Sequence, residues 1–220
     1  MFSMYLEELK KPFYHFCYVG KFNPFHKAHK YVYDFLVNTM HKYNLDGNVY
    51  VCTSLKDSDF LTASQKTRII QLSGVPADHI VNHSGYSIKG LLGAVNGKEE
   101  DILVTAFSQK DLDDGSKTDF LKIPKDQITS WRIIKNLNDL PYIRPVNFIH
   151  KEYKDMAEKK AAKGTGYAIT VPTQTNEKSI VSSSLIRKLI EQNKWDEVKK
   201  LMDNNAFKYL KEIKEIKNNE

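Results

Sequence analysis

Short apolar stretches rich in β-branched and aromatic residues recur along the chain, separated by more polar segments. Five of them have the composition of buried strands. These are His15 to Gly20, Asn48 to Thr53, Ile102 to Phe107, Val146 to His150 and Tyr167 to Val171. Ile80-Val81 is long enough for only a brief additional strand. The chain is therefore predicted to form a sheet of five or six strands.

Several segments between and after these stretches have helical spacing instead. The clearest follows the first predicted strand, where apolar residues fall three and four apart on one face. They are Tyr31, Val32, Phe35, Leu36 and Met40. Ser64 to Ser73 and Tyr86 to Val95 predict shorter helices, and the pattern is helical after Val181. Strands alternating with helices indicate right-handed crossovers, so we expect an α/β fold with a Rossmann-like parallel sheet flanked by helices and a C-terminal helical segment.

Two polar segments interrupt this alternation. Asp111 to Gln127 is rich in Asp and Lys and predicts a surface loop or lid near the strand ends, and Lys154 to Gly166 is a second polar stretch. With 220 residues, 41% of them hydrophobic, the chain suits one good core. We therefore expect a single domain with a core of about 13–192 and C-terminal helices at about 193–217.

Composition and charge limit the expected partners and cellular location of the protein. The net charge of +6 suits a polyanionic partner, but acidic residues alternate with the C-terminal lysines, which favours solvated helix faces over a nucleic-acid groove. No apolar run has the length of a membrane span, and the N-terminal residues lack a secretory signal, so we expect a cytoplasmic protein without a membrane partner. Cys17 and Cys52 lie inside predicted strands and are expected to be buried thiols.

The segment Gly20-Lys21-Phe22-Asn23-Pro24-Phe25-His26-Lys27-Ala28-His29 directly follows the first predicted strand. In an open parallel sheet, ligands bind at the carboxyl ends of strands, where helix N-termini also converge. Gly20 lets the chain turn sharply, and Pro24 stiffens the turn before a helix that begins near Lys27. His26 and His29 lie three apart, so both imidazoles project toward one anion and donate hydrogen bonds to phosphate oxygens.

This segment resembles the motif Gly-x-Phe-x-Pro-x-His-x-Gly-His of the nucleotidyltransferase superfamily. It matches at Gly20, Phe22, Pro24, His26 and His29, and departs from it at Ala28, where the family has Gly. The resemblance implies catalytic roles for both histidines and nucleotide contacts from the Gly20 to Pro24 loop, including Lys21 and Asn23. The Ala28 methyl group lies where nucleotide affinity would be altered.

A second motif lies near the C-terminal end, at Val181-Ser182-Ser183-Ser184-Leu185-Ile186-Arg187. Serines at a helix start cap backbone N–H groups and offer hydroxyls to phosphates, and a guanidinium one turn later adds charge-assisted bonds. The segment is similar to the family motif Ile-Ser-Ser-Thr-x-Ile-Arg. The resemblance implies that Ser182, Ser183 and Ser184 bind the nucleotide and that Arg187 assists catalysis by holding the β and γ phosphates.

Three further residues are candidates for binding the second substrate, the acceptor. Lys66 and Arg68 resemble basic residues that open the second helix in the family, which implies that they hold the acceptor's phosphate, although a charged helix face explains them nearly as well. Trp131 has a ring suited to stacking on an aromatic acceptor, although a tryptophan among apolar neighbours more often belongs to the core.

The resemblance implies in-line attack of an acceptor phosphate on the α-phosphate of a nucleoside triphosphate, with release of pyrophosphate and with Mg²⁺ held mainly by the triphosphate. Pro24 in Phe22-Asn23-Pro24 favours ATP over CTP, and the form of the motif looks most like that of nicotinamide mononucleotide adenylyltransferases. The expected acceptor is nicotinamide or nicotinate mononucleotide. The layout also looks similar to nucleotidyltransferases encoded by tailed bacteriophages. A cytidylyltransferase acting on a phosphorylated alcohol, a non-catalytic nucleotide-binding regulator and a homo-oligomer remain open alternatives.

Overall fold

A computed structural model describes most of the chain and shows a parallel sheet between helices. The described residues are 12–98, 100–108, 129–143, 164–172, 175–176 and 179–217. Six strands form the main sheet in the order β3-β2-β1-β4-β6-β5, and every neighbouring pair is parallel. Their bounds are β1 Tyr14–Val19, β2 Gly47–Thr53, β3 Ile80–Asn82, β4 Ile102–Ser108, β5 Thr129–Ile134 and β6 Gly164–Val171. The predicted α/β class is confirmed.

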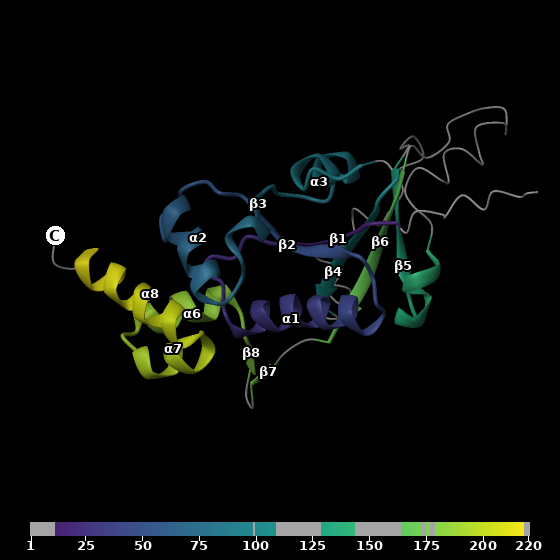
Figure 1. Cartoon of the computed structure of the whole chain (residues 1–220). Coiled ribbons are helices and arrows are strands. Elements are labelled where there is room, and N and C mark those ends of the chain that lie inside the picture. Colours follow the sequence, from purple (N-terminus) through teal and green to yellow (C-terminus); the bar gives the residue numbers. More distant parts are fainter. Residues whose placement is uncertain are drawn as a thin grey trace, which may run out of the picture.

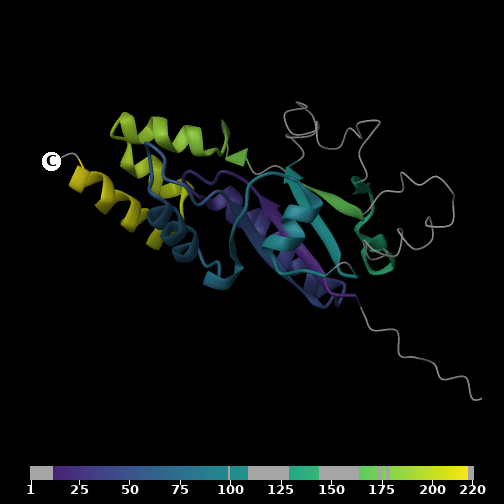
Figure 2. The same ribbon diagram turned by 90° about the horizontal axis from the view of Figure 1, so that it is seen from above.

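Helices cover both faces of this sheet (Figure 1). The helices are α1 Lys27–Lys42, α2 Ala63–Leu72, α3 Ile88–Ala94, α6 Ser183–Glu191, α7 Trp195–Leu201 and α8 Asn204–Lys217. Short 3₁₀ helices occupy Ala77–His79 and Leu137–Tyr142, and a small antiparallel pair is formed by β7 Thr175–Asn176 and β8 Ser179–Ile180. The C-terminal helices gather at the end of the molecule away from β5 (Figure 2).

The two faces of the sheet belong to two separate apolar clusters, because successive strand residues point to opposite sides. Phe16 and Tyr18 of β1 face a large cluster that includes residues of α1, α2, α6, α7 and α8. Cys17 and Val19 face a smaller cluster built with α3. Both cysteines are buried free thiols, as predicted. The larger cluster therefore links the C-terminal helices to the sheet.

The structure corrects three details of the predicted elements. Strand β5, at the edge of the sheet, was not predicted. Gly164 to Gly166 belongs to β6, although the sequence places these residues at the end of a polar stretch. The helix expected from Tyr86 begins at Ile88, because the Ser87 hydroxyl caps it by accepting from the Gly90 N–H at 3.2 Å. Val146 to His150 and the expected loop at Asp111 to Gln127 lie outside the described residues.

Candidate active site

The loop after β1 is held in a tight shape that needs a glycine at its start. The Gly20 N–H donates to the Cys52 carbonyl at 3.0 Å and so extends the pairing with β2. The chain then turns through Phe22, which has a φ of 44°, and a cis bond joins Asn23 to Pro24. A Cβ at Gly20 would lie 2.5 Å from the Phe22 ring. Gly20 is thus needed because the buried Phe22 ring folds back over it.

Helix α1 begins directly after this loop and brings the two histidines together. His26 occupies the N-cap position without a side-chain cap hydrogen bond, and the first turn holds no acidic residue. The imidazoles of His26 and His29 stack with ring centroids 3.6 Å apart. A helix N-terminus with exposed N–H groups attracts anions. The predicted pairing of the two imidazoles at one helix end is therefore present in the fold.

His26 lies deeper than His29. Only 2% of His26 is exposed, and neither of its ring nitrogens has a hydrogen-bond partner among the described residues. Burial lowers the pKa of His26 from 6.5 to about 3, because desolvation disfavours the charged imidazolium. The ring is therefore neutral near pH 7, with one nitrogen able to donate and the other able to accept a hydrogen bond.

Three side chains from two elements hold the carbonyl groups of this loop. The Thr53 hydroxyl, at the end of β2, donates to the Lys21 carbonyl at 3.2 Å. In α6, the Ser183 hydroxyl donates to the Pro24 carbonyl at 2.9 Å, and Arg187 Nη1 donates to the Asn23 carbonyl at 2.6 Å. The two motifs, far apart in sequence, are therefore in direct contact.

A cavity of about 440 Å³ opens beside this loop, within the usual size of small-ligand sites. It is bordered by the carboxyl ends of β1, β2 and β3 and by residues of α1 and α6. The lining residues are Tyr18, Val19, Gly20, Lys21, Phe22, His29, Ser54, Ser84, Gly85, Tyr86 and Ser183. Open α/β folds bind their ligands at these carboxyl ends of the strands.

Not all predicted nucleotide-binding residues reach the cavity. Gly20, Lys21, Phe22, His29 and Ser183 line it. The remaining predicted residues are absent from the lining: Asn23, Pro24, His26, Ala28, Ser182, Ser184 and Arg187. Several of these have structural partners instead, since the Ser182 hydroxyl caps α6 at the Leu185 N–H and the Ser184 hydroxyl accepts from Arg187 Nη2. Their roles in binding stay predictions.

The three acceptor candidates also lie outside the cavity lining. Lys66 is buried, and its Nζ donates to the carbonyls of Ser54 at 2.9 Å and Lys56 at 3.3 Å. Burial lowers the pKa of Lys66, and Asp57 opposes this shift. Arg68 is exposed. Their direct contact with an acceptor stays a prediction, and the geometry of Lys66 shows that it braces the Ser54 side of the cavity.

Trp131 sits behind the cavity in β5. Only 7% of it is exposed, and its indole N–H donates to the Tyr86 carbonyl at 2.9 Å. A Cβ at Gly166 would come within 2.5 Å of the indole ring, so the neighbouring strand β6 leaves room for it only with a glycine there. Stacking of Trp131 on an acceptor stays a prediction. The hydrogen bond from Trp131 shows that this residue positions the backbone of Tyr86 beside the cavity.

Six cavity residues were not predicted as site residues: Tyr18 and Val19 at the end of β1, and Ser54, Ser84, Gly85 and Tyr86. Ser54 directly follows β2, and Ser84 to Tyr86 follow the short strand β3. Gly85 has a φ of 96°, a left-handed conformation that favours glycine. Residues that directly follow parallel strands are candidates for ligand binding, and this position could have indicated them. For Ser84 to Tyr86 the indication was weak, because β3 has only three residues and its apolar pattern is short.

Within the described part of the chain, no group of three or more His, Cys, Asp or Glu side chains is arranged to hold a metal ion. The described helices include none with the length and apolar character needed to cross a membrane.

Comparison with known proteins gives matches in structure only. No protein-family model matches the chain, and no curated protein matches it significantly in sequence. Plasmodium falciparum nicotinic acid mononucleotide adenylyltransferase has a similar structure both in its complex with APC and in its complex with NaAD. The TM-score is 0.52 for both complexes, and each match covers 91% of this chain. The APC complex is 14% identical with 96% of its chain covered, and the NaAD complex is 15% identical with 95% of its chain covered. This similarity shows that the chain shares the fold of that protein.

A weaker match is Thermotoga maritima TmcAL bound with alpha-thio ATP. Its TM-score is 0.47 at 13% identity, and the match covers 93% of this chain. The chain spans only 56% of the length of that protein.

Proposed function

We propose that this chain is an adenylyltransferase that joins the AMP moiety of ATP to a phosphorylated small molecule and releases pyrophosphate. The observation that carries the proposal is the stacked pair His26 and His29 at the start of α1, with His29 on the cavity that Gly20 and Ser183 also line. Similarity in fold to an adenylyltransferase supports it. Nicotinamide or nicotinate mononucleotide is the proposed acceptor.

In the proposed reaction, an acceptor phosphate oxygen forms a bond to the α-phosphorus of ATP. The bond from that phosphorus to the bridging oxygen breaks, and the electron pair leaves with pyrophosphate. His29 and the neutral His26 donate hydrogen bonds to oxygens that gain negative charge. The protein therefore contributes positioning and charge stabilisation and supplies no nucleophile.

Arg187 and Ser183 have a proposed double role. Arg187 uses two of its five N–H donors on the Asn23 carbonyl and the Ser184 hydroxyl, so three remain for the β and γ phosphates. Ser183 both lines the cavity and holds the Pro24 carbonyl. This arrangement would couple phosphate binding at α6 to the shape of the loop beneath the nucleotide.

Mg²⁺ is the proposed cofactor, held by the triphosphate and water. Mg²⁺ usually keeps several waters and binds through substrate phosphates with one or two carboxylates, so it needs no dense carboxylate cluster. When bound, the ion would neutralise the charge that develops on the leaving pyrophosphate.

The proposal is tested by incubating the full chain with ATP or CTP, Mg²⁺ and a panel of phosphorylated acceptors while following pyrophosphate. The panel contains nicotinamide and nicotinate mononucleotides, phosphopantetheine, choline phosphate, glycerol phosphate and flavin mononucleotide. We expect release with ATP and a mononucleotide. Release with CTP alone favours a cytidylyltransferase, and tight ATP binding without release from any pair favours a nucleotide-binding regulator.

His29→Ala tests the site itself. Loss of a hydrogen-bond donor to a developing negative charge costs about 10²–10³ in kcat, so we expect a fall of that size. His41→Ala is the matched control, because His41 lies in the last turn of the same helix, exposed and away from the cavity. Undiminished activity in His29→Ala would show that the site is assigned wrongly.

A further inference from the structure

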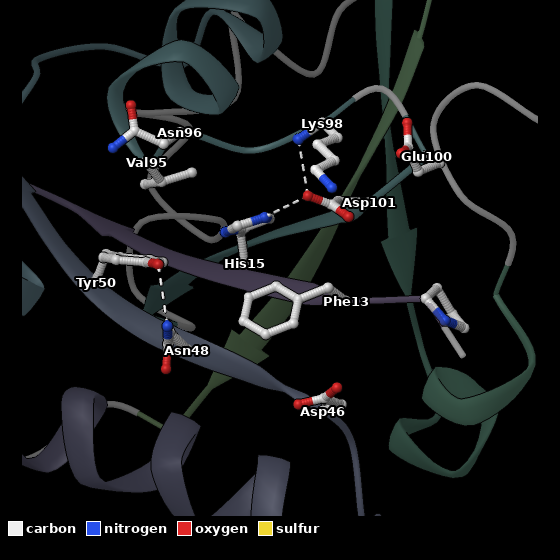
Figure 3. A pocket seen from close by; sticks show the side chains of 11 residues that line it. Phe13, His15, Asp46, Asn48, Tyr50, Val95, Asn96, Lys98, Glu100 and Asp101 are labelled. Atoms are coloured by element: carbon white, nitrogen blue, oxygen red, sulfur yellow. Dashed lines mark hydrogen bonds and ion pairs between the residues drawn. The ribbon is translucent and has the colours of Figure 1, made fainter. Parts of the chain in front are cut away.

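A second cavity lies at the amino ends of the central strands, whereas the candidate active site lies at their carboxyl ends. Its volume is about 690 Å³, within the range of small-ligand sites, and Figure 3 shows the side chains around it. Asn48 and Tyr50 come from the beginning of β2, His15 from the beginning of β1, and Asp101 directly precedes β4. Because β1 has six residues, the two cavities lie about 20 Å apart along that strand.

The floor of this cavity contains a buried pair of ionisable side chains. His15 Nε2 lies 2.8 Å from Asp101 Oδ2, and the Lys98 backbone N–H donates to the same oxygen at 2.7 Å. Only 3% of His15 and 8% of Asp101 are exposed. Since a carboxylate only accepts hydrogen bonds, the Asp101 side chain fixes a proton on Nε2 of the imidazole. The charge of Asp101 is thereby already matched by donors of the protein.

The other ring nitrogen of His15 has nothing to bond to in the protein. Nδ1 is buried and has no hydrogen-bond partner among the described residues. In Figure 3 it is the ring nitrogen turned away from Asp101, on the side of Tyr50. With the proton on Nε2, a neutral ring leaves Nδ1 as an acceptor. Buried polar atoms almost always have a partner, so this nitrogen points to a ligand that carries an N–H donor.

Aromatic rings lie on both sides of the His15 imidazole. The ring centroid of His15 lies 5.0 Å from that of Phe13 and 5.9 Å from that of Tyr50, and the Tyr50 ring is nearly parallel to the imidazole. All three rings line the cavity, Phe13 directly before β1, His15 in β1 and Tyr50 in β2. A lining with several aromatic rings suits a flat ring, which gains from offset stacking as well as from burial.

The rim of the cavity carries more negative than positive charge. Asp46 and Glu100 are exposed carboxylates there, whereas Lys98 is the one exposed amine in the lining. The Asn48 amide donates to the Tyr50 hydroxyl at 3.2 Å, which leaves the Asn48 carbonyl oxygen as an acceptor. Carboxylates and aromatic faces together attract an organic cation.

We propose that this second cavity binds a flat aromatic amine. The ring of the ligand lies on Phe13 and Tyr50, one N–H group donates to His15 Nδ1, and the negatively charged rim formed by Asp46 and Glu100 attracts a protonated amine. The site is separate from the proposed nucleotide site, so the proposal does not depend on the adenylyltransferase activity.

Calorimetric titration of the full chain with tryptamine tests this proposal. Indole-3-propionate is the matched ligand, because it has the same ring and a two-carbon tether but ends in a carboxylate. We expect tryptamine to bind about tenfold or more tightly than indole-3-propionate. Equal affinities, or no binding of tryptamine at about 1 mM, would overturn the proposal.

Variants locate the binding. Asp46→Asn and Glu100→Gln change exposed rim residues, so they leave the fold intact, and each is expected to weaken tryptamine binding about threefold or more. Glu191→Gln, an equally exposed change on α6, is expected to have no effect. His15→Gln is expected to weaken binding about tenfold. Unchanged affinity in both rim variants would contradict the proposed contacts.

Competition distinguishes the two cavities. We expect the affinity for tryptamine to be unchanged when ATP is saturating, because the sites lie at opposite ends of β1. Displacement of tryptamine by ATP would place the amine in the nucleotide cavity and would overturn the proposal. This result would leave the nucleotidyl transfer experiment unaffected.

Discussion

His26 is the residue at which burial and the proposed role in catalysis oppose each other most strongly. An imidazole with two polar atoms is held almost entirely out of water, and its nitrogens have no partner in the described part of the chain. Leaving a buried polar atom unpaired costs about 1–3 kcal/mol. A phosphate oxygen reaching His26 would offset this cost, which fits the proposed role at the scissile bond.

His26 also makes the stability of the fold depend on pH. Its pKa is about 3 in the folded chain and 6.5 as the ordinary value, so between these values only the unfolded chain binds this proton. Stability from this group is therefore present above pH 6.5 and is lost as the pH falls toward 3. At pH 5 the loss is about 2 kcal/mol relative to pH 7.

His26→Gln is expected to remove this part of the pH dependence. Urea unfolding of both proteins at pH 7 and pH 5 measures it, with the exposed His41→Gln as control. If the variant and the natural chain lose the same free energy of unfolding between the two pH values, His26 is protonated equally in both states and the expectation fails.

Lys66 and Arg68 differ in burial, so their substitutions are expected to differ in their effect on stability. Lys66→Met removes the donor that holds the Ser54 and Lys56 carbonyls, so we expect a loss of about 1–3 kcal/mol in urea unfolding, and weaker ATP binding because Ser54 lines the cavity. Arg68→Met changes an exposed residue and is expected to stay within about 0.5 kcal/mol.

The same two variants test the predicted acceptor contacts. A raised acceptor KM in Arg68→Met with unchanged stability would support direct contact between Arg68 and the acceptor. Unchanged stability in Lys66→Met, together with a raised acceptor KM, would mean that Lys66 binds the acceptor and does not brace the loop.

How far the site follows from sequence depends on the kind of residue. Gly20 and Ser183 were predictable because motifs record local backbone shape, and both line the cavity. The partners of Lys66 and Trp131 were not, because each side chain donates to a backbone carbonyl distant in sequence or hidden in a loop. Local patterns carry no information about such carbonyls.

At the scale of elements, the loop between β1 and α1 depends on its first residue. Gly20→Ala would push a methyl group into the Phe22 ring, which is itself buried against Phe25 and His29. Overpacking of this kind costs about 1–3 kcal/mol. We expect this loss in urea unfolding, together with weaker ATP binding in calorimetry.

Gly93→Ala is the matched control for Gly20→Ala. Gly93 lies in α3, exposed, and a Cβ there meets nothing within 4 Å. Because alanine favours helix more than glycine, this change is expected to raise stability by up to about 1 kcal/mol. If both alanine variants are equally stable, the contact between Gly20 and the Phe22 ring has no energetic consequence.

The strands illustrate what sequence patterns reveal about elements. The central strands β1, β2 and β4 were predicted within one or two residues, because burial on both faces produces continuous apolar runs. Strand β5 was missed because it is an edge strand, where Arg132 and Ile133 are exposed and the apolar run is broken. Edge strands are defined by their neighbour in the sheet more than by their own sequence.

At the scale of the whole molecule, the C-terminal helices belong to the main apolar cluster. Val198, Leu201 and Met202 are buried there, as are Ala206, Phe207 and Leu210 of α8, and α8 packs beside α2. Lys27 Nζ in α1 also donates to the Lys200 carbonyl at 2.9 Å. The sheet and these helices therefore share one core.

A chain ending at Gln192 is expected to lose cooperative unfolding, because removal of α7 and α8 exposes the apolar face shared with α2. Burying one such aliphatic or aromatic side chain contributes about 1.5–3 kcal/mol, and the total stability of a domain is only about 5–15 kcal/mol. Near-ultraviolet circular dichroism and urea unfolding measure the effect. A truncated chain that unfolds cooperatively at the same urea concentration would show that residues up to 192 fold independently.

The contact between Arg187 and the Asn23 carbonyl also sets when the site can exist during synthesis. The ribosome makes Arg187 only 164 residues after Asn23, the sequence separation of this hydrogen bond. A nascent chain that has not yet released α6 lacks both Ser183 and Arg187 beside the loop. The proposed nucleotide site is therefore assembled only after the six strands of the main sheet have been synthesised.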